Sequence, residues 1–435
     1  MFRPLLGLFL TVGITVSGAQ NPAHIDNVHS GYVTAIPSQD NFDANGLHFL
    51  VNSQTRRAVR VRTAGAAPDG HKSIRIGDYV EVKGARNRKT NSILAEEITL
   101  QTWSAQQIKG FAVIDKLIAT SPETIVRADG YRIQLPLSAD LTFEGPLKSI
   151  ADVTTNVWIS YSGELGKDGV VVVSKAIFSQ NVVDKHESNF REKGDKVLSP
   201  SRQNAKGEID LPYTFAKLKI SSDIQVQERV NRIGQLLVPA YQRALPATDP
   251  TKIVFKFYAL NNKSHAGVWS YAGGEVFVPV QVVERLQNDD QLAAVLADGI
   301  AKVLEKQTYR VIRPATNTMA AAEVAGLVGG FFVPGLGAAG VAGVMTAGKK
   351  VDELMQEQSG RVSLGLMQDA GFRVDQAPIA WQRLLKPKAK DPSKEPVTSQ
   401  AEYLLQMLAI GYRQASPSIL LGPARTLSNL QAAAD

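Results

Sequence analysis

The first half of the chain consists of short segments in which apolar and polar residues alternate. Residues 78–84 (Asp-Tyr-Val-Glu-Val-Lys-Gly) alternate cleanly, and residues 157–161 (Val-Trp-Ile-Ser-Tyr) follow a related pattern. A period of two places alternate side chains on one face of a strand. Glycine and aspartate residues, which favour turns, separate these segments. The pattern predicts a series of short strands that continues to residue 180.

This strand-rich half contains an internal repeat at an offset of 79 residues. The matching blocks are 31–36 with 110–115, 79–84 with 158–163, and 93–100 with 172–179, which places Ile98 on Ile177. Three blocks in one register predict a duplicated unit. Four or five short strands per unit suit a small closed or partly open barrel. We therefore expect two small all-β barrels, over residues 28–102 and 107–180.

The motifs of the repeat are a Gly-x-Val opening, a Gly-Asp-x-Val-x-Val-x-Gly centre and an Ile-x-Ala-x-x-Ile close. With these motifs the two units resemble tandem OB-like domains of the bacterial envelope, whose function is unassigned. An OB-like barrel raises the question of nucleic-acid binding, because Arg56, Arg57, Arg60, Arg62 and the basic run 83–89 lie near Tyr79 in the sequence. We favour the alternative that Tyr32, Phe49, Tyr79 and Trp158 pack inside the barrels and that the charges are solvated. No nucleic acid is then expected as a partner.

The pattern changes after a polar, charged segment at residues 181–212, which has no apolar period and is predicted to be a linker. Beyond it, residues 224–243 carry apolar side chains at helical spacing: Val230, Ile233, Leu236, Leu237 and Tyr241. Residues 253–260 and 275–280 have the composition of strands. Asn288 and two aspartates then cap a strongly apolar helix predicted from residue 291 to 307, and a last helix is expected over 399–412. The second half is predicted to be mainly helical, in an α+β arrangement.

The order of these elements, with the segment Asn-Asp-Asp-Gln-Leu-Ala-Ala-Val-Leu-Ala at 288–297, resembles the HtpX/BepA-type zinc metallopeptidase family. A later segment, 358–372, resembles the family's third-ligand helix. The resemblance covers about residues 220–385 and implies a zincin fold for the domain at 213–435. In that family an H-E-x-x-H motif binds zinc through two histidines and activates a water through the glutamate. A glutamate on the later helix completes the zinc site.

The resemblance places Asp298 and Lys302 at the two histidine positions and Gly299 at the position of the catalytic glutamate. Gln358 stands where the third ligand belongs, and Gly360 replaces a supporting aspartate. A lysine ammonium cannot ligate zinc, and hydrolysis by this mechanism requires both a metal and a base. Since residues 298 and 302 are four apart on a helix, we expect them to form an ion pair. The chain is predicted to be a degenerate member, with no catalytic residue, no metal ligand and no cofactor.

Composition excludes several other chemistries. The 435-residue chain has no cysteine and six histidines, which excludes disulfide scaffolds and thiolate metal sites. His265 is the only histidine of the second half, and a site that combines it with Asp298 and Glu357 is possible but not required by the spacing. The net charge of +7 is spread among acids, which favours an ordinary basic surface over a nucleic-acid footprint.

Two segments bear on localisation. Residues 1–19 combine one arginine, a run of apolar residues and a small-residue end, as in a secretory signal peptide. We therefore expect an exported protein, periplasmic or extracellular. Residues 324–348 carry no charge and are rich in glycine and alanine. This insertion is predicted to form a helical hairpin that packs on the domain or touches lipid, although its length also permits a span.

We predict an exported pseudopeptidase that binds a peptide or an envelope protein without cleaving it. An extended peptide is expected to add to the strand at 275–280 as an edge. Two alternatives stay open at this point. One is an active peptidase with a rebuilt metal site, and the other is a protein that binds its ligand through the barrels.

Overall fold

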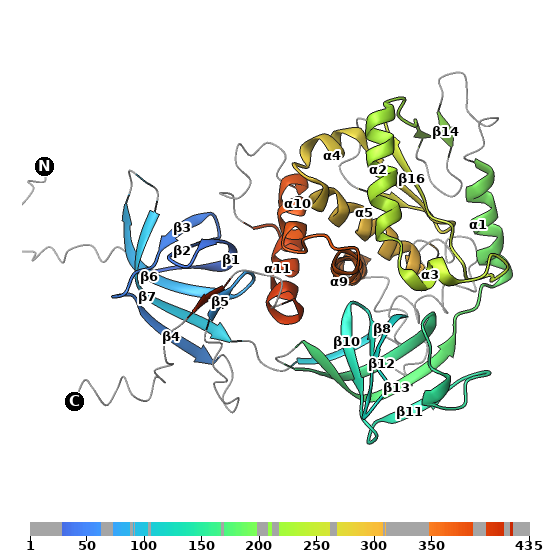
Figure 1. Ribbon diagram of the computed structural model, residues 1–435, viewed down its shortest axis with the longest axis horizontal. Coiled ribbons are helices and arrows are strands. Elements are labelled where there is room, and N and C mark those ends of the chain that lie inside the picture. The colour runs from blue at the N-terminus through green and yellow to red at the C-terminus, as the bar shows by residue number, and fades with distance from the viewer. Residues whose placement is uncertain are drawn as a thin grey trace, which may run out of the picture.

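The computed structural model describes residues 28–61, 73–87, 90, 92–102, 106–166, 169–197, 208–210, 217–261, 268–307, 309, 348–385, 397–412 and 418–420. The chain is a multidomain α+β protein with a β-rich N-terminal part and a mainly helical C-terminal part (Figure 1). The segments expected to be a signal peptide and a helical hairpin lie outside the described residues, apart from Gly348. Within the described ranges no helix is both long enough and apolar enough to cross a bilayer.

The first barrel is built from strands β1 (Val28–Ser38), β2 (Asn41–Ala44), β3 (Leu47–Leu50), β6 (Tyr79–Asn87) and β7 (Ser92–Thr102). β1, β2 and β3 form an antiparallel meander, β1 also pairs with β6, and β6 pairs with β7. A parallel pairing of β3 with β7 closes the barrel. β4 (Arg56–Val61) adds to the outer side of β7. Phe42, Phe49 and Ile93 are among the buried side chains that fill the interior.

The second barrel repeats this topology with β8 (Gln106–Ala119), β9 (Thr124–Ala128), β10 (Tyr131–Leu135), β12 (Val157–Leu165) and β13 (Val170–Gln180). The parallel closure recurs between β10 and β13, and β11 (Asp140–Phe143) occupies the outer position of β4. A register shift also recurs at one place, between Lys83 and Gly84 in β6 and between Ser162 and Gly163 in β12. The two sheets therefore share their strand order, their closure and their irregularity.

Steric crowding explains why the repeat has glycine at equivalent positions of its two hairpins. A Cβ at Gly84 would lie 2.2 Å from the carbonyl oxygen of Leu94, and a Cβ at Gly163 would lie 2.4 Å from that of Val172. Since real Cβ atoms do not approach backbone oxygens so closely, both hairpins require glycine beside the bulge. The β2–β3 turn also contains Asn45 with a positive φ of 45°. Its counterpart in the second barrel is Asp129, with φ of 55°.

The single offset of 79 is wrong for the third block of the repeat. Gly84 pairs with Ala95 eleven positions later, whereas Gly163 pairs with Val173 only ten positions later. The second hairpin is therefore one residue shorter, and the last strands align at an offset of 78. Ile98 corresponds to the buried Ala176 and not to Ile177.

The predicted linker contains a helix, α1 (Lys185–Val197), so the interpretation of residues 181–212 as linker throughout is wrong. Most of its described side chains are exposed, which hides the periodicity, but Glu187 and Phe190 are buried one turn apart. Phe190 stacks on Tyr271 with 4.5 Å between ring centroids. Lys306 donates hydrogen bonds of 2.8 Å to Glu187 and to the Val182 carbonyl. This helix therefore packs on the helical part of the molecule.

The helical part contains α2 (Ile224–Leu237), α3 (Ala240–Ala244), α4 (Val280–Arg285), α5 (Asp289–Leu304), α9 (Gly348–Asp369), α10 (Gln376–Leu385) and α11 (Ser399–Gly411). Asp223 caps α2 through the Val226 amide, and Asn288 caps α5 through the Gln291 amide, as helix N-termini require. α2 ends before Val238, earlier than predicted, and Leu236 is exposed. α5 is the central helix and is buried along most of its length.

A three-stranded sheet of order β16-β18-β17 covers α5, with strands β16 (Lys256–Leu260), β17 (Trp269–Ser270) and β18 (Glu275–Pro279). β16 and β18 run parallel, and β17 pairs antiparallel to β18. A small hairpin of β14 (Ile209–Asp210) and β15 (Lys217–Leu218) lies beyond it. The last described strand, β19 (Ser418–Leu420), pairs with β5 (Ser73–Arg75). The last described strand of the predicted domain 213–435 therefore lies in a separate two-stranded sheet with β5, the segment that precedes β6 of the first barrel.

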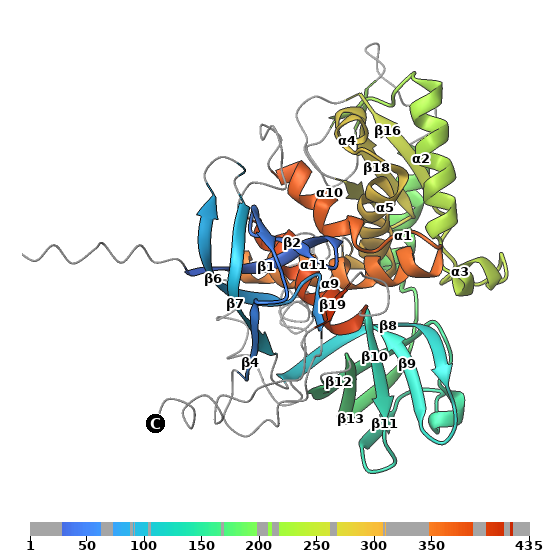
Figure 2. The ribbon, with the colours of Figure 1, turned by 60° about the vertical axis from the view of Figure 1, so that its left-hand side comes forward.

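The two barrels contact different sides of the helical part. In Figure 1 the second barrel lies below α3 and α9, whereas the first barrel lies beside α11. Figure 2 shows the same separation after rotation. Tyr32 on β1 accepts a 2.9 Å hydrogen bond from Gln406 on α11, so the first barrel is joined to the last helix.

Candidate functional site

The expected ion pair on α5 is present. The Nζ of Lys302 lies 2.8 Å from Oδ2 of Asp298. The other carboxylate oxygen accepts a 2.6 Å hydrogen bond from the hydroxyl of Ser359 on α9. Asp298 and Ser359 are fully buried, and Lys302 extends toward solvent with 27% of its side chain exposed. The charge at the first histidine position is thus neutralised by the residue at the second.

The position expected for a catalytic glutamate is filled by neighbouring side chains. A Cβ at Gly299 would lie 2.7 Å from Cγ1 of Val276 and 3.1 Å from Cγ2 of Val268. Val276 belongs to the centre of β18 and has no exposed surface. A side chain at position 299 would therefore require Val276 to shift, and the present packing leaves no space for a general base.

Gln358 does not face the pair on α5. Its Nε2 donates a 2.9 Å hydrogen bond to the carbonyl of Phe111 on β8, and its Oε1 accepts a 3.1 Å bond from Gln307. The residue at the third-ligand position therefore joins α9 to the second barrel and to the end of α5. Its neighbour Ser359 is the α9 residue that reaches Asp298. The sequence comparison alone did not single out this serine.

The remaining expected positions do not assemble into a metal site. A Cβ at Gly360 would contact Leu404 on α11 at 3.3 Å, so this glycine faces the last helix. Glu357 lines a separate hollow of about 220 Å³ between α9 and α11, together with Tyr403. His265 lies outside the described residues. Across the described ranges no group of three or more histidine, aspartate or glutamate side chains is placed to hold a metal ion. The residues at the positions expected for zinc ligands do not fit zinc.

The strand expected to receive a peptide is not an edge. β18 lies between β16 and β17, and its five residues are all buried. The outer side of β16 is covered as well. Gln227 on α2 donates to the Phe257 carbonyl at 2.7 Å and accepts from the Ala259 amide at 3.0 Å, as a neighbouring strand would. The hypothesis of strand addition at 275–280 is therefore wrong, because these backbone groups already have partners.

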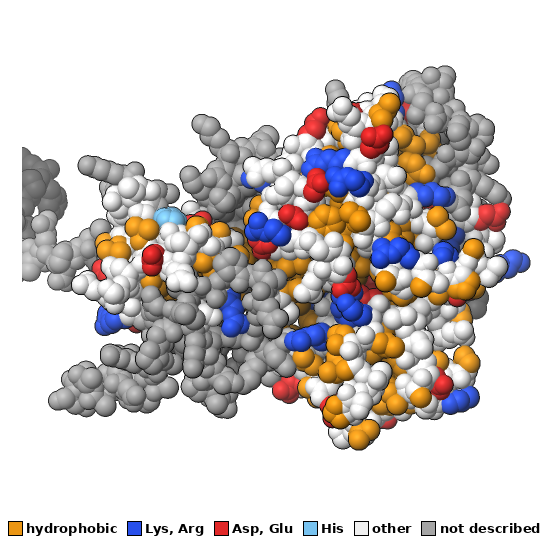
Figure 3. Space-filling view, viewed as in Figure 1, with side chains coloured by type: hydrophobic (Ala, Val, Ile, Leu, Met, Phe, Trp, Pro, Cys, Tyr) orange, Lys and Arg blue, Asp and Glu red, His pale blue; other side chains and the backbone are white. Residues whose placement is uncertain are grey.

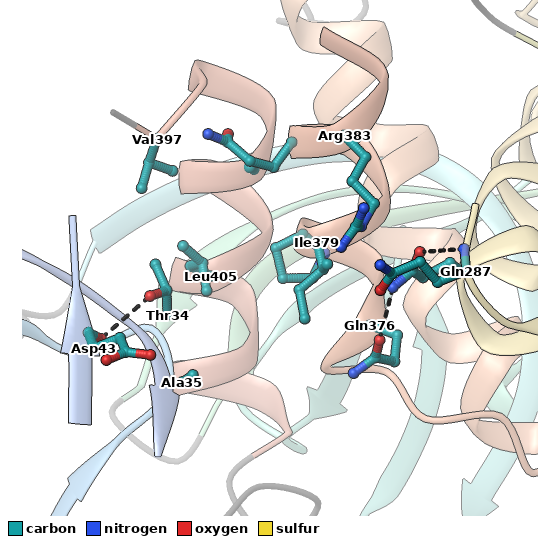
Figure 4. Close-up of a pocket in the computed structure, with 13 residues that line it drawn as sticks. Thr34, Ala35, Asp43, Gln287, Gln376, Ile379, Arg383, Val397 and Leu405 are labelled. Atoms are coloured by element: carbon teal, nitrogen blue, oxygen red, sulfur yellow. Dashed lines mark hydrogen bonds between the residues drawn. The ribbon is translucent and has the colours of Figure 1, made fainter. Parts of the chain in front are cut away.

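A cavity of about 240 Å³ opens instead between the first barrel and the last two described helices (Figure 4). Its lining residues are Thr34, Ala35, Asp43, Gln287, Gln291, Gln376, Pro378, Ile379, Gln382, Arg383, Val397, Ala401 and Leu405. Thr34, Ala35 and Asp43 come from β1 and β2, and the other residues come from the helical part. Figure 4 shows the barrel wall and the α10 wall facing each other across the space.

The two walls differ in chemistry. Ile379, Ala401 and Leu405 give an apolar floor, while four glutamines and Arg383 lie on the helical side. Gln291 donates a 3.1 Å hydrogen bond to Gln376, so this part of the wall is fixed. On the barrel wall Asp43 lies 2.6 Å from Nδ1 of His48.

No signal in the sequence identified this cavity. Its walls come from β1, β2, α10 and α11, and α10 and α11 lie more than 300 residues beyond the barrel strands. Arg383 sits in an ordinary helical pattern, and the glutamines carry no recognisable spacing. The cavity arises from packing between domains, which periodicity does not report.

On the face seen in Figure 3, the charged side chains of the described residues do not gather by sign. Basic and acidic side chains are interspersed there over the helical part and the second barrel. Tyr32 and Tyr79, expected inside the first barrel, are only half-buried and contact each other edge to face at 5.0 Å. Phe49 and Trp158 are buried as expected.

One family model matches the chain. It is described as a domain of unknown function (DUF5666) and covers residues 30–99, which form most of the first barrel. A search of the curated proteins found no significant match. This similarity lies within the first barrel.

Proposed function

We propose that this protein is a non-catalytic binding protein of the cell envelope, built on two OB-like barrels and a degenerate zincin domain, that holds a peptide or protein without hydrolysing it. The observation that carries the proposal is the state of the expected zinc site. Asp298 is neutralised by Lys302 and accepts a hydrogen bond from Ser359, and Val276 fills the space beside Gly299. A site altered in this way retains its packing but has lost the donors and the base that hydrolysis needs.

The fold supports the two architectural parts of the proposal. A five-stranded barrel with a three-stranded meander, a hairpin and one parallel closure is the strand arrangement of an OB-type barrel. In the helical part, a buried central helix lies under a small mixed sheet, and a second helix contacts it at the level of Asp298. This layout agrees with the family resemblance of the sequence. The signal peptide predicted at residues 1–19 supports the envelope as the site of action.

The first test is metal content and hydrolysis. We expect the purified chain to carry no stoichiometric zinc in elemental analysis and to leave fluorescein-labelled casein intact. The same labelled casein should bind to the chain, as measured by fluorescence anisotropy. Zinc-dependent cleavage of casein that is lost in Asp298→Ala would refute the proposal. Failure of the intact chain to bind any unfolded protein or peptide would also contradict it.

A rebuilding experiment tests why the site is inactive. The variant with Asp298→His, Gly299→Glu, Lys302→His and Gln358→Glu restores every expected ligand and the base. We expect it to bind no zinc at one equivalent and to be less stable, because the new side chain at position 299 would collide with Val276. The matched control omits the change at Gly299 and should be less destabilised. If the rebuilt chain cleaves casein, ligand loss alone explains the inactive site.

A further inference from the structure

We propose that the cavity between the first barrel and the helices α10 and α11 binds the free carboxyl terminus of an extended peptide, with Arg383 holding the terminal carboxylate. This inference rests on the proposed peptide-binding function and adds its place and chemistry. It does not involve the strand edge of the sheet or the former zinc site.

Arg383 provides the charge. It is half-buried, and its Nε is buried without a hydrogen-bond partner within the described part of the chain. The ion pairs found among the described residues do not include it. Arg75 and Arg191 also have one buried nitrogen without a partner, but Arg75 donates to Ser73 and Arg191 pairs with Glu187. Arg361 bonds both the carboxylate and the carbonyl of Asp129. Among the described residues Arg383 makes no side-chain hydrogen bond of this kind. In Figure 4 the Arg383 side chain runs from α10 toward Ile379 and the centre of the cavity.

An arginine in the last turn of a helix also interacts favourably with the helix dipole, and α10 ends at Leu385. That interaction does not require the guanidinium to be buried, because an exposed arginine would have it too. A buried N–H group without a partner costs free energy that a bound acceptor would recover. Carboxylates match the planar fork of a guanidinium with two parallel hydrogen bonds. The unpaired nitrogen therefore indicates a carboxylate ligand.

The floor of the cavity supplies the apolar part of the site. Ile379 and Val397 are half-buried, and Leu405 and Ala401 present apolar surface from α11. An apolar side chain beside a carboxylate is the chemistry of a peptide ending in a hydrophobic residue. The volume of about 240 Å³ suits a short terminal segment and not a folded domain.

The amides favour a peptide over a simple fatty acid. Gln287 is exposed at the rim, and its side-chain amide makes no hydrogen bond to the residues described here. It can donate to a peptide carbonyl and accept from a peptide N–H. Across the cavity, Asp43 lies on the barrel wall, paired with His48. A carboxylate on that wall repels an anion but accepts from peptide N–H groups, which orients the terminal carboxylate toward Arg383.

The test uses the full chain and two fluorescein-labelled heptapeptides of one sequence ending in Ala-Leu-Leu, one with a free carboxyl group and one amidated. We expect the free acid to bind at least tenfold more tightly in fluorescence anisotropy. In Arg383→Gln the affinity for the free acid should fall about tenfold, which corresponds to about 1.4 kcal/mol. Its affinity for the amide should not change. Arg383→Lys should retain part of the preference, because a lysine keeps the charge but not the fork.

Three controls keep the result interpretable. Arg285→Gln removes a half-buried arginine from the end of α4 that does not line the cavity, and it should bind both peptides normally. Ala35→Trp fills the cavity from the barrel side and should abolish binding of both peptides. Gln287→Ala, at the exposed rim, should weaken both peptides a few-fold and should not affect folding. Melting temperatures within about 2 °C of the parent confirm that a variant is folded.

The outcomes separate this inference from the proposed function. Equal binding of acid and amide, or an Arg383→Gln variant that retains the preference, overturns the assignment of the carboxylate, while binding without cleavage would still support a pseudopeptidase. If dodecanoate binds tightly, displaces the peptide and has the same affinity for the Gln287→Ala variant, the cavity holds fatty acids instead. Absence of binding by either peptide overturns the inference. Cleavage of the peptides would refute the proposed function and leave the Arg383 dependence to be judged separately.

Discussion

The two barrels share one topology but are attached to the helical part in different ways. The second barrel is held by buried arginines from both sides. Arg361 on α9 bonds Asp129 at the β9–β10 turn, and Arg127 on β9 bonds Asp369 at the end of α9 at 2.5 Å. The first barrel is attached by fewer hydrogen bonds: Gln406 donates to Tyr32, the Val397 amide donates to Asn45, and β5 pairs with β19. It forms one wall of the cavity instead.

The aromatic residues at equivalent positions of the two barrels differ in how deeply they are buried. Tyr32 and Tyr79 form an aromatic pair in the first barrel, and the residues 79 positions later, Phe111 and Trp158, form a stacked pair in the second. Both pairs face the helical part. The pair in the second barrel is covered by the helical part, since Trp158 is buried and the Nζ of Lys306 lies 5.9 Å from the centroid of its ring. The pair in the first barrel is half-buried. One copy of the unit has become a fixed support, and the other borders a binding space.

The largest effect is expected when the buried arginine of the second barrel is removed. Arg361→Met leaves Asp129 buried with only Tyr161 as a side-chain donor. Breaking a buried pair on one side costs about 3–5 kcal/mol. We expect this loss in hydrogen-exchange protection of residues 124–135. Residues 28–50 of the first barrel should be unaffected.

Two variants check this prediction. Arg56→Met in the first barrel removes an arginine that is 70% exposed and lies 3.5 Å from Glu97. Such surface pairs contribute less than about 1 kcal/mol, so its effect should be small. Arg361→Met combined with Asp129→Asn should recover part of the loss, since no buried charge is left unpaired. Equal effects of Arg361→Met and Arg56→Met would show that the second barrel is not held more firmly than the first.

A smaller effect is expected at equivalent glycines. A Cβ at Gly110 would lie 2.5 Å from the ring of Tyr161, which is buried and bonded to Asp129. A Cβ at Gly31 would lie 2.4 Å from Cβ of Asn45, at an exposed turn that is able to move. Overpacking costs about 1–3 kcal/mol, so Gly110→Ala should lie near the top of this range and Gly31→Ala near its bottom.

Urea unfolding followed by circular dichroism measures both variants. Gly411→Ala is the control, because a Cβ there has no atom within 4 Å, and it should be close to neutral. If Gly31→Ala is the more destabilising variant, the first barrel is the more rigid of the two, which contradicts the view that the second barrel is held more firmly.

The sequence predicted the parts of the fold that depend on local patterns. Alternation in 78–84 identified β6, and helical spacing identified α2 and α5. The ion pair between Asp298 and Lys302 followed from spacing on a helix whose buried face was already apparent. These features depend on neighbours within a few residues of each other, which a sequence displays directly.

The features that the sequence did not predict depend on contacts between residues far apart in the chain. α1 was interpreted as linker because Phe190 and Glu187 are buried by residues more than 80 positions away. The prediction of an edge at 275–280 is wrong because a sequence does not show that Trp269 and Ser270 pair with β18. Arg383 is an ordinary helical arginine until β1 and β2 are placed opposite to it. Tertiary packing determines all three, and it also creates the candidate site.

The smallest effect concerns pH at the rim of the second barrel. Partial burial alone would raise the pKa of Asp369, but hydrogen bonds and charges from Arg127 and Lys116 outweigh it and hold this pKa below its usual range. A lowered carboxyl pKa contributes stability that is complete above about pH 4 and is lost as the pH falls through the lowered value. Because the side chain is one-third exposed, we expect less than about 1 kcal/mol.

Asp369→Asn isolates this contribution when urea midpoints are compared between pH 6 and pH 3. The parent should be more stable than the variant at pH 6, and the difference should shrink toward pH 3. Burial raises the pKa of Asp115, the other carboxylate on Arg127, so that group gives a pH dependence of opposite sign. It is present in both proteins and largely cancels in the difference. If the difference in urea midpoint between parent and variant is as large at pH 3 as at pH 6, Asp369 supports the second barrel by packing and not by charge. The two barrels would then differ less in their electrostatic attachment to the helical part.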